Sequence, residues 1–260
     1  MNEAILAHFH PDERPFVERM AKVAERAADR HRVELTDFLD PRQAAIADML
    51  VRRHPGLHAL FAGGHPGAER MRGVIAPSYI PLDPEDARLA LIRIVPAGGG
   101  AEELEHGDYL GALLGLGIKR DKIGDLHVSA DECQCVVAAE MADYIDLHLR
   151  KVHRVPVTTE RLPVSALRPV IPETAELTLS VASLRLDAVA GDVWRLSRAR
   201  VLEPIRAGRC RVNWMPVDDP ARPLREGDTV SMRGFGRFRL VRVDGETKSG
   251  RLRITVAKFG

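Results

Sequence analysis

Arginine gathers in the last third of this 260-residue chain. From Ser183 to Gly260 there are 15 Arg and 2 Lys against 9 Asp and Glu, a net charge of +8, whereas residues 1–182 carry a net charge of −7. Guanidinium groups bind phosphate through paired hydrogen bonds and stack on bases, which the ammonium of lysine does not. This uneven charge indicates that the C-terminal part binds a polyanion. A GC-rich genome would also favour Arg over Lys, but it does not explain why acidic residues are scarcer there.

Two short helices and several strands must position these arginines. The spacing predicts helices at 184–193 and 198–207, with Ser197 as a favourable cap of the second and Gly208 as its end. Strands separated by turn glycines are predicted to follow at 210–214, 229–233, 237–244 and 251–257. The helix pair and the first hairpin would bring six arginines together: Arg185, Arg198, Arg200, Arg206, Arg209 and Arg211. Such a surface reads A-form RNA mainly through its backbone and shape. The alternative is a solvated arginine face on a small β domain.

The motifs S-L-R-L-D (183–187), I-R-A-G-R-C-R-V-N (205–213), P-L-R-E-G-D (223–228) and R-G-F-G-R-F (233–238) occur in this order. Together they resemble an S4-type RNA-binding domain. The resemblance implies that four residues face RNA: Arg185, Ser197, Arg198 and Asn213. Arg233 and Arg237 in the last motif complete the set of candidate RNA-binding residues. Asp187 is expected to hold the helix pair together or to orient an arginine.

Residues 71–162 alternate between strand and helix. The predicted order is βαββαβ, with strands at 88–95, 122–128, 133–137 and 155–162 and helices at 106–117 and 138–152, which is typical of a ferredoxin-like or RRM-like unit. An RRM that reads RNA stacks bases on aromatic residues of its central strands, and strands 122–128 and 133–137 contain none. Any RNA contact here would depend on Lys119, Arg120 and Lys122. An exposed polar loop is an equally good interpretation of that cluster.

The N-terminal part, residues 1–70, is predicted to be mainly helical. Helices are expected at 14–32 and 41–53, the second capped by Asp40, and a short buried strand at 57–62. Residues 73–79 are a candidate for one more strand. Three prolines between 163 and 172 indicate a linker. The predicted α+β chain therefore has a helical domain (1–70), an RRM-like domain (71–162), a linker with a strand (163–182) and an S4 domain (183–260).

A second recognisable stretch is H-G-D-Y-L-G-A-L-L-G-L-G-I-K-R-D-K-I-G-D at 106–125. With the C-terminal motifs it makes the whole chain resemble the YlmH family of S4-domain RNA-binding proteins. The resemblance implies a non-enzymatic factor that binds rRNA on the large ribosomal subunit and serves rescue and quality control of stalled nascent-chain–tRNA complexes. Contact with tRNA is left open, as are looser family links to cell division and photosystem assembly. Structured RNA is thus the expected partner, and DNA is not.

No catalytic constellation emerges from the sequence. There is no G-x-S-x-G or H-E-x-x-H, and the glycines before Lys119 do not form a P-loop. An RNA-modifying enzyme, such as a pseudouridine synthase or an rRNA methyltransferase that uses an S4 domain for targeting, is the alternative. It lacks support, because no G-x-G-x-x-G follows a strand and L-R-L-D lies inside the binding module. A protein–protein adaptor that docks through the acidic N-terminal part is a third possibility.

Three cysteines cannot form a disulfide framework, which fits a reducing cytoplasm. Cys133 and Cys135, with His127 nearby, could suggest a metal, but a structural zinc site needs four ligands and no second pair exists. Buried free thiols are therefore predicted, with no metal and no cofactor. The N-terminus lacks the order of a secretory signal, and no stretch is long and apolar enough to span a membrane. A membrane partner is not expected.

Overall fold

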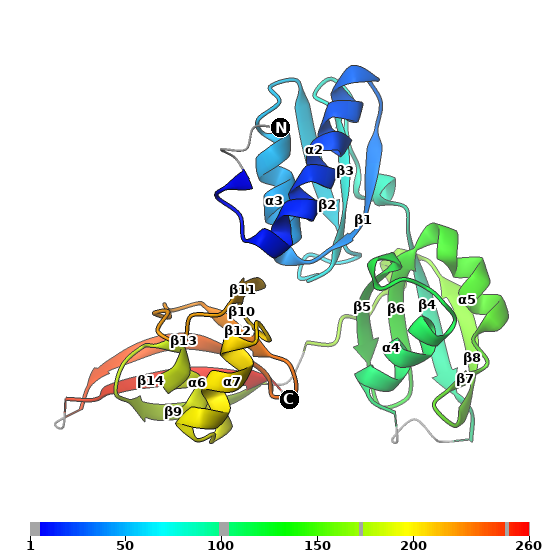
Figure 1. Cartoon of the computed structure of the whole chain (residues 1–260). Helices are drawn as coiled ribbons and strands as arrows, with labels where there is room; N and C mark the ends of the chain where they lie inside the picture. The colour runs from blue at the N-terminus through cyan, green and yellow to red at the C-terminus, as the bar shows by residue number, and fades with distance from the viewer. Residues whose placement is uncertain (1–5, 99–103, 172–173, 248–249, 260) are drawn as a thin grey trace. The chain divides into compact units, whose positions relative to one another are not determined.

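The computed structural model describes residues 6–98, 104–171, 174–247 and 250–259. These residues form a mixed α/β structure of helices and antiparallel sheets (Figure 1). They divide into two compact units: the first consists mainly of Glu13–Val170, and the second of Ile171 to the C-terminal end together with Ala7–Asp12. Short 3₁₀ turns lie at Pro11–Glu13, Pro84–Ala87, Arg120–Lys122, Ala139–Met141 and Val164–Ala166.

The first unit begins with two helices and a three-stranded sheet. Its elements are α2 (Arg14–Asp29), β1 (Glu34–Leu39), α3 (Pro41–Val51), β2 (Leu57–Ala62) and β3 (Met71–Pro77), and the antiparallel strand order is β1-β3-β2. Asp40 caps α3 as expected: its Oδ1 accepts from the backbone N–H of Gln43 at 2.8 Å, and the Gln43 side chain accepts from the N–H of Asp40.

The expectation of a mainly helical N-terminal part was incomplete, because β1 was not foreseen. This strand carries Glu34 and Asp37 beside its buried residues, so its pattern in the sequence is weak. It is stabilised instead by pairing with β3, which comes more than thirty residues later. Long-range pairing of this kind overrides a weak local preference.

The rest of the first unit follows the predicted βαββαβ order, but the expected helix at 138–152 is shorter and an additional short strand, β7, occupies its predicted C-terminal end. It contains β4 (Leu89–Pro96), α4 (His106–Gly115), β5 (Ile123–Val128), β6 (Cys133–Ala138), α5 (Ala142–His148), β7 (Lys151–Val152) and β8 (Val155–Leu162). The antiparallel order is β5-β6-β4-β8-β7. Buried residues of α4 and α5, including Tyr109, Leu113 and Ile145, pack with Ile92 and Cys135 on one face of this sheet, which we call the middle sheet.

The other face of the middle sheet is partly covered. Leu91, Val136 and Ala138 form a second cluster with Phe38 of β1, and Leu162, Ala166 and Leu167 pack against it. Gly124 of β5 lies so close to Phe38 that a Cβ atom there would approach the phenyl ring to 2.7 Å. Residue 124 must therefore be glycine for β1 to reach the sheet. This cluster covers the part of the second face around Leu91 and Val136, whereas Arg93 and Glu160 on the same face are 40% and 59% exposed.

The second unit contains two helices and a six-stranded sheet. The elements are β9 (Thr174–Val181), α6 (Leu186–Trp194), α7 (Arg198–Arg206), β10 (Cys210–Val212), β11 (Met215–Val217), β12 (Thr229–Met232), β13 (Gly236–Glu246) and β14 (Leu252–Phe259). The strand order is β11-β10-β12-β13-β14-β9. Gly208 follows α7 with a φ of +67°, the conformation that its predicted role as helix end requires. We call this sheet the C-terminal sheet; α6 and α7 pack on one of its faces.

Candidate nucleic-acid interface

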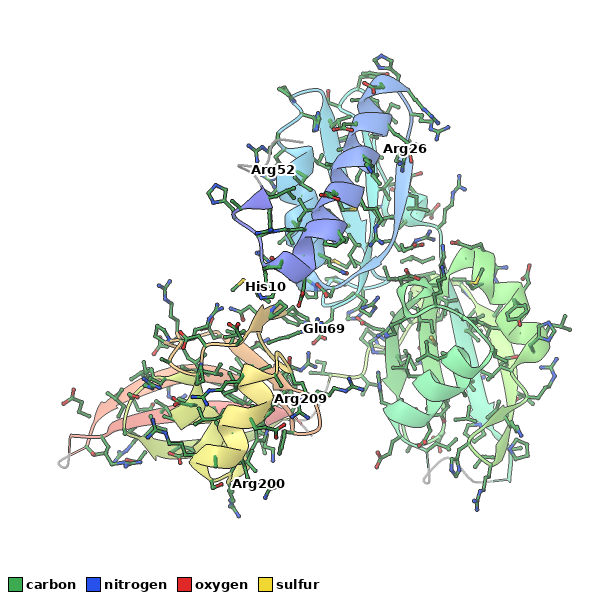
Figure 2. All side chains as sticks on the ribbon, in the orientation of Figure 1. His10, Arg26, Arg52, Glu69, Arg200 and Arg209 are labelled. Atoms are coloured by element: carbon green, nitrogen blue, oxygen red, sulfur yellow. The ribbon has the colours of Figure 1, made fainter. Side chains whose placement is uncertain are left out.

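Helix α7 presents three arginines to solvent. Val201 and Ile205 face the core, whereas Arg198, Arg200 and Arg206 are exposed. Figure 2 shows Arg200 and Arg209 at the two ends of this helix. Ser197 stands at the N-cap position, but its hydroxyl makes no capping hydrogen bond. The first turn of α7 therefore combines free backbone N–H groups with two arginines, an arrangement suited to phosphate.

Arg185 is held in place by Asp187. Its Nε and Nη2 donate to the two carboxylate oxygens of Asp187 at 3.0 and 2.9 Å, and the backbone N–H of Ala188 donates to the same carboxylate. The hydrogen bonds from Arg185 lower the pKa of the buried Asp187 carboxyl. Asp187 thus orients an arginine, as its place in the motif led us to expect. The Arg185 side chain remains about two-fifths exposed, at 44%.

Asn213 and Arg209 make internal contacts. The amide of Asn213 donates to Asp228 at 2.7 Å and accepts from the N–H of Thr229 at 2.9 Å, so both ends of the amide stabilise the hairpin. Arg209 forms an ion pair with Glu203, and its carbonyl accepts from the N–H of Arg233. Arg233 itself is exposed in the turn before β13. Asn213 therefore stabilises the turn between β10 and β11.

A second group of arginines lies on the face of the C-terminal sheet opposite α6 and α7. Cys210 and Val212 of β10 are buried against the helices, and so is Phe238 of β13. Because side chains alternate along a strand, Arg211 and Arg237 occupy the other face. They flank Ser231 in register across three strands. We call this the open face of the C-terminal sheet.

Three further arginines extend this open face. Arg239 follows Arg237 at the strand spacing of two and donates from Nε to Thr229 Oγ1 at 3.3 Å. Arg242 lies opposite Thr255, and Arg253 lies opposite Ser180. Arg237 stacks 4.5 Å above the ring of Phe259. None of these three arginines was expected from the sequence, although the R-x-R-x-x-R pattern of 237–242 was a signal for Arg239 and Arg242.

The candidate arginines therefore do not form a single cluster. Arg185 and the arginines of α7 lie on the helical side, and Arg211 and Arg237 lie on the open face. Arg209 and Arg233 lie next to each other where β10 begins and β12 ends. The second unit offers two cationic surfaces on opposite sides of one sheet.

The basic cluster of the first unit is mostly used within that unit. Lys122 forms ion pairs with Asp37 at 2.5 Å and Glu140 at 3.0 Å. Arg120 donates to the carbonyl of Ile123 at 2.5 Å, and burial, with Arg70 nearby, lowers the pKa of Arg120 to about 10. Of the three candidates, only Lys119 is exposed; Arg120 and Lys122 are partly buried. Lys122 therefore links β1 to the middle sheet, and the Arg120 guanidinium is used within the turn that leads into β5.

The contact between β1 and the middle sheet also accounts for other residues of the I-K-R-D-K-I-G-D stretch at 118–125. Asp125 accepts from the backbone N–H groups of Glu69 at 2.7 Å and Arg70 at 3.2 Å, and Arg70 donates to the carbonyl of Phe38. With Gly124 beneath Phe38, this stretch fastens the three-stranded sheet to the middle sheet. The recognisable motif at 118–125 thus has a structural reason at most of its positions.

The thiols are buried as expected. Cys133, Cys135 and Cys210 are free, and burial raises the pKa of Cys135 to about 12 and that of Cys210 to about 11. Among the residues placed in the structure, no group of His, Cys, Asp and Glu could hold a metal ion. Nor does any helix within the described ranges have the length and apolar character needed to cross a membrane.

Comparisons with known proteins agree with this architecture. A family model described as "YlmH, N-terminal" matches residues 12–80, and one described as "Putative RNA-binding domain in YlmH" matches residues 84–166. The chain is 35% identical over 251 residues to the ribosome-associated protein quality control protein P2 of Bacillus subtilis (strain 168), which covers 96% of this chain and 97% of that protein.

A solved structure shows the same fold in part. It is the cell division protein ylmH from Streptococcus pneumoniae, with a TM-score of 0.53 and 24% identity, and the match covers 60% of this chain and 94% of that one. The two domain matches and the nearly full-length relative together mean that the chain belongs to the YlmH family.

Proposed function

We propose that this protein is a non-enzymatic, cytoplasmic RNA-binding protein that acts on the ribosome. Its second unit is an S4-like domain that binds rRNA of the large subunit and tRNA. Residues 84–166 form an RRM-like domain. The cellular task is rescue and quality control of stalled nascent-chain–tRNA complexes. The name of the Bacillus subtilis relative and the family description of residues 84–166 support this class of function.

The observation that carries the proposal is the pair of cationic surfaces on the C-terminal sheet. Exposed arginines on α7 and on the open face lie within a segment whose net charge is +8. Binding to a phosphate backbone releases counterions, so such surfaces give affinity that is strong at low salt and largely independent of sequence. Recognition would follow the shape of folded RNA.

The binding residues proposed on the helical side are Arg185, Ser197, Arg198, Arg200 and Arg206. Those proposed on the open face and sheet edge are Arg209, Arg211, Arg233, Arg237 and Arg239, with Asn213 shaping the hairpin. In the first unit, Lys119 is the cation of the 119–122 cluster left to contact RNA. A base-stacking contact of the RRM type is not part of the proposal, because β5 and β6 carry no Phe, Tyr or Trp and because Phe38 and residues 164–167 cover the face around Val136.

The test is a salt titration of RNA affinity with matched variants of the full chain. Wild type should bind a structured rRNA fragment with an affinity that falls steeply between about 50 and 200 mM salt. The double variant R198A/R200A should bind about tenfold more weakly with a shallower salt slope, whereas R30A/R53A, which removes two exposed arginines of the first unit, should match wild type. A flat salt response of the wild type would overturn the proposal.

The enzymatic alternative is tested separately. Mass spectrometry of rRNA and tRNA from cells lacking the gene should show every modification that wild-type cells contain. Loss of one modified nucleotide, restored by the wild-type gene, would contradict a non-enzymatic role.

A further inference from the structure

The hairpin between β10 and β11 is closed by two residues in an uncommon conformation. Val212 pairs with Met215, and Asn213 and Trp214 between them have φ values of +51° and +63°. A two-residue turn with both φ values positive favours Asn-Gly, because glycine has no Cβ to clash in the left-handed region. Asn213 suits its place, but Trp214 occupies the position that glycine would fill without strain.

The core of the second unit does not explain why a bulky indole stands there. The other tryptophan, Trp194, packs in the core with its ring centroid 5.1 Å from that of Phe238 and 6.1 Å from that of Phe235. Trp214 is half-buried, yet it is absent from that core, and its side chain has no hydrogen bond, ion pair or ring contact with any residue the structure describes. Packing on the core therefore does not offset the backbone strain at Trp214.

Hydrogen bonds nevertheless fix the backbone of the turn that carries the indole. The Asn213 amide clamps the turn to Asp228 and Thr229, as described above. Strand β10 is paired on both sides, with β11 at the edge of the sheet. A large side chain on a fixed tip at a sheet edge is available to a partner molecule, and strained residues of this kind cluster at ligand-binding positions.

We propose that Trp214 is a stacking platform for an unpaired base of the bound RNA, which rests on the proposed function. Every base has a π face that an indole can cover, and stacking needs a base that is not held inside a helix. Arg211, three residues earlier on β10, is exposed. The hairpin would then contact phosphate through Arg211 and a looped-out base through Trp214.

The decisive variants are W214G and W214F in the full chain. W214G removes the indole and the strain together, so its melting temperature should equal that of wild type or exceed it by up to about 4 °C. Its affinity for an rRNA fragment with an unpaired loop should fall about tenfold at an unchanged salt slope, because stacking involves no counterions. W214F should keep most of the affinity but lose most of the RNA-induced quenching of tryptophan fluorescence.

A matched control separates relief of strain from loss of stacking. His153 is an exposed residue with a φ of +51° in the two-residue turn between β7 and β8. H153G should raise the melting temperature slightly and leave RNA affinity unchanged.

Three results would overturn the inference. The first is that W214G binds RNA as tightly as wild type, and the second is that W214G melts well below wild type. The third is that W214G no longer co-sediments with ribosomes while it binds naked RNA normally, which would mean that the indole contacts a ribosomal protein. If R198A/R200A weakens binding but W214G does not, only the stacking inference fails. If wild type does not bind RNA, the proposed function fails, and the inference with it.

Discussion

The middle sheet and the C-terminal sheet are built alike on one face and differently on the other. Each carries two helices on its first face. The second face of the middle sheet is covered around Leu91 and Val136 by Phe38 and residues 164–167, and its exposed part carries Arg93 beside Glu160. The second face of the C-terminal sheet instead carries exposed Arg211, Arg239 and Arg253. From this difference we expect the stronger RNA contact on the C-terminal sheet, because its exposed second face carries the larger positive charge.

The largest effect is expected from reversing charge on the open face. The full-chain double variant R211E/R239E should bind structured RNA about 100-fold more weakly at low salt, with a salt slope reduced by about two, because two phosphate contacts become repulsive. R30E/R53E changes the net charge of the first unit equally and should stay within about threefold of wild type. Equal losses in the two variants would mean that total charge, not the open face, drives binding.

Uncovering the middle sheet should cost stability and not RNA affinity. Phe38 is 1% exposed, and F38A leaves a cavity against the sheet, so we expect the first unit to lose about 3–5 kcal/mol and its calorimetric transition to fall by about 10 °C. Below that transition, RNA affinity should remain within about twofold of wild type. A much larger change in affinity at unchanged stability would place RNA on the middle sheet.

Variants of Lys119 and Lys122 in the first unit should distinguish a role in stability from a role in RNA binding. K122A removes both ion pairs to Asp37 and Glu140 and should lower stability by about 1 kcal/mol with no change in RNA affinity. K119A, which removes an exposed charge, should leave the melting temperature unchanged and weaken RNA binding about twofold at low salt. The reverse pattern would contradict the roles given to the two residues.

The smallest effect concerns Asp187 and pH. Arg185 lowers the pKa of the Asp187 carboxyl in the folded chain, so the pair stabilises the protein above the unfolded pKa near 4 and loses this contribution as pH falls through the folded value. D187N should therefore melt a few degrees below wild type at pH 7, and this difference should shrink towards pH 3. A difference that is constant with pH would indicate that Asp187 acts through its hydrogen bond to Ala188 alone.

Local patterns predicted most elements. The strand and helix order of 88–162 follows from hydrophobic periodicity, and Gly208 and Asp40 mark helix ends that the structure confirms. Such features depend on residues close in the chain. The missed strand β1 depends on β3, a distant partner.

The candidate site was harder to predict for the same reason. That Arg211 and Arg237 face away from α7 follows only from the register of three strands. That Asn213 and Lys122 are engaged internally depends on Asp228 and Asp37, which are distant in sequence. Composition alone identified the arginine-rich segment. Strand pairing and hydrogen bonds between residues distant in sequence determine which of these arginines can contact a ligand.

Hydrogen exchange of the full chain, measured with and without a structured rRNA fragment, tests most directly the claim that the second unit carries RNA binding. The account predicts slower exchange at the start of α7, in the β10–β11 hairpin and along β13 when RNA is added, with little change across 84–166. Protection confined to 84–166, with 198–217 and 236–246 unchanged, would contradict it.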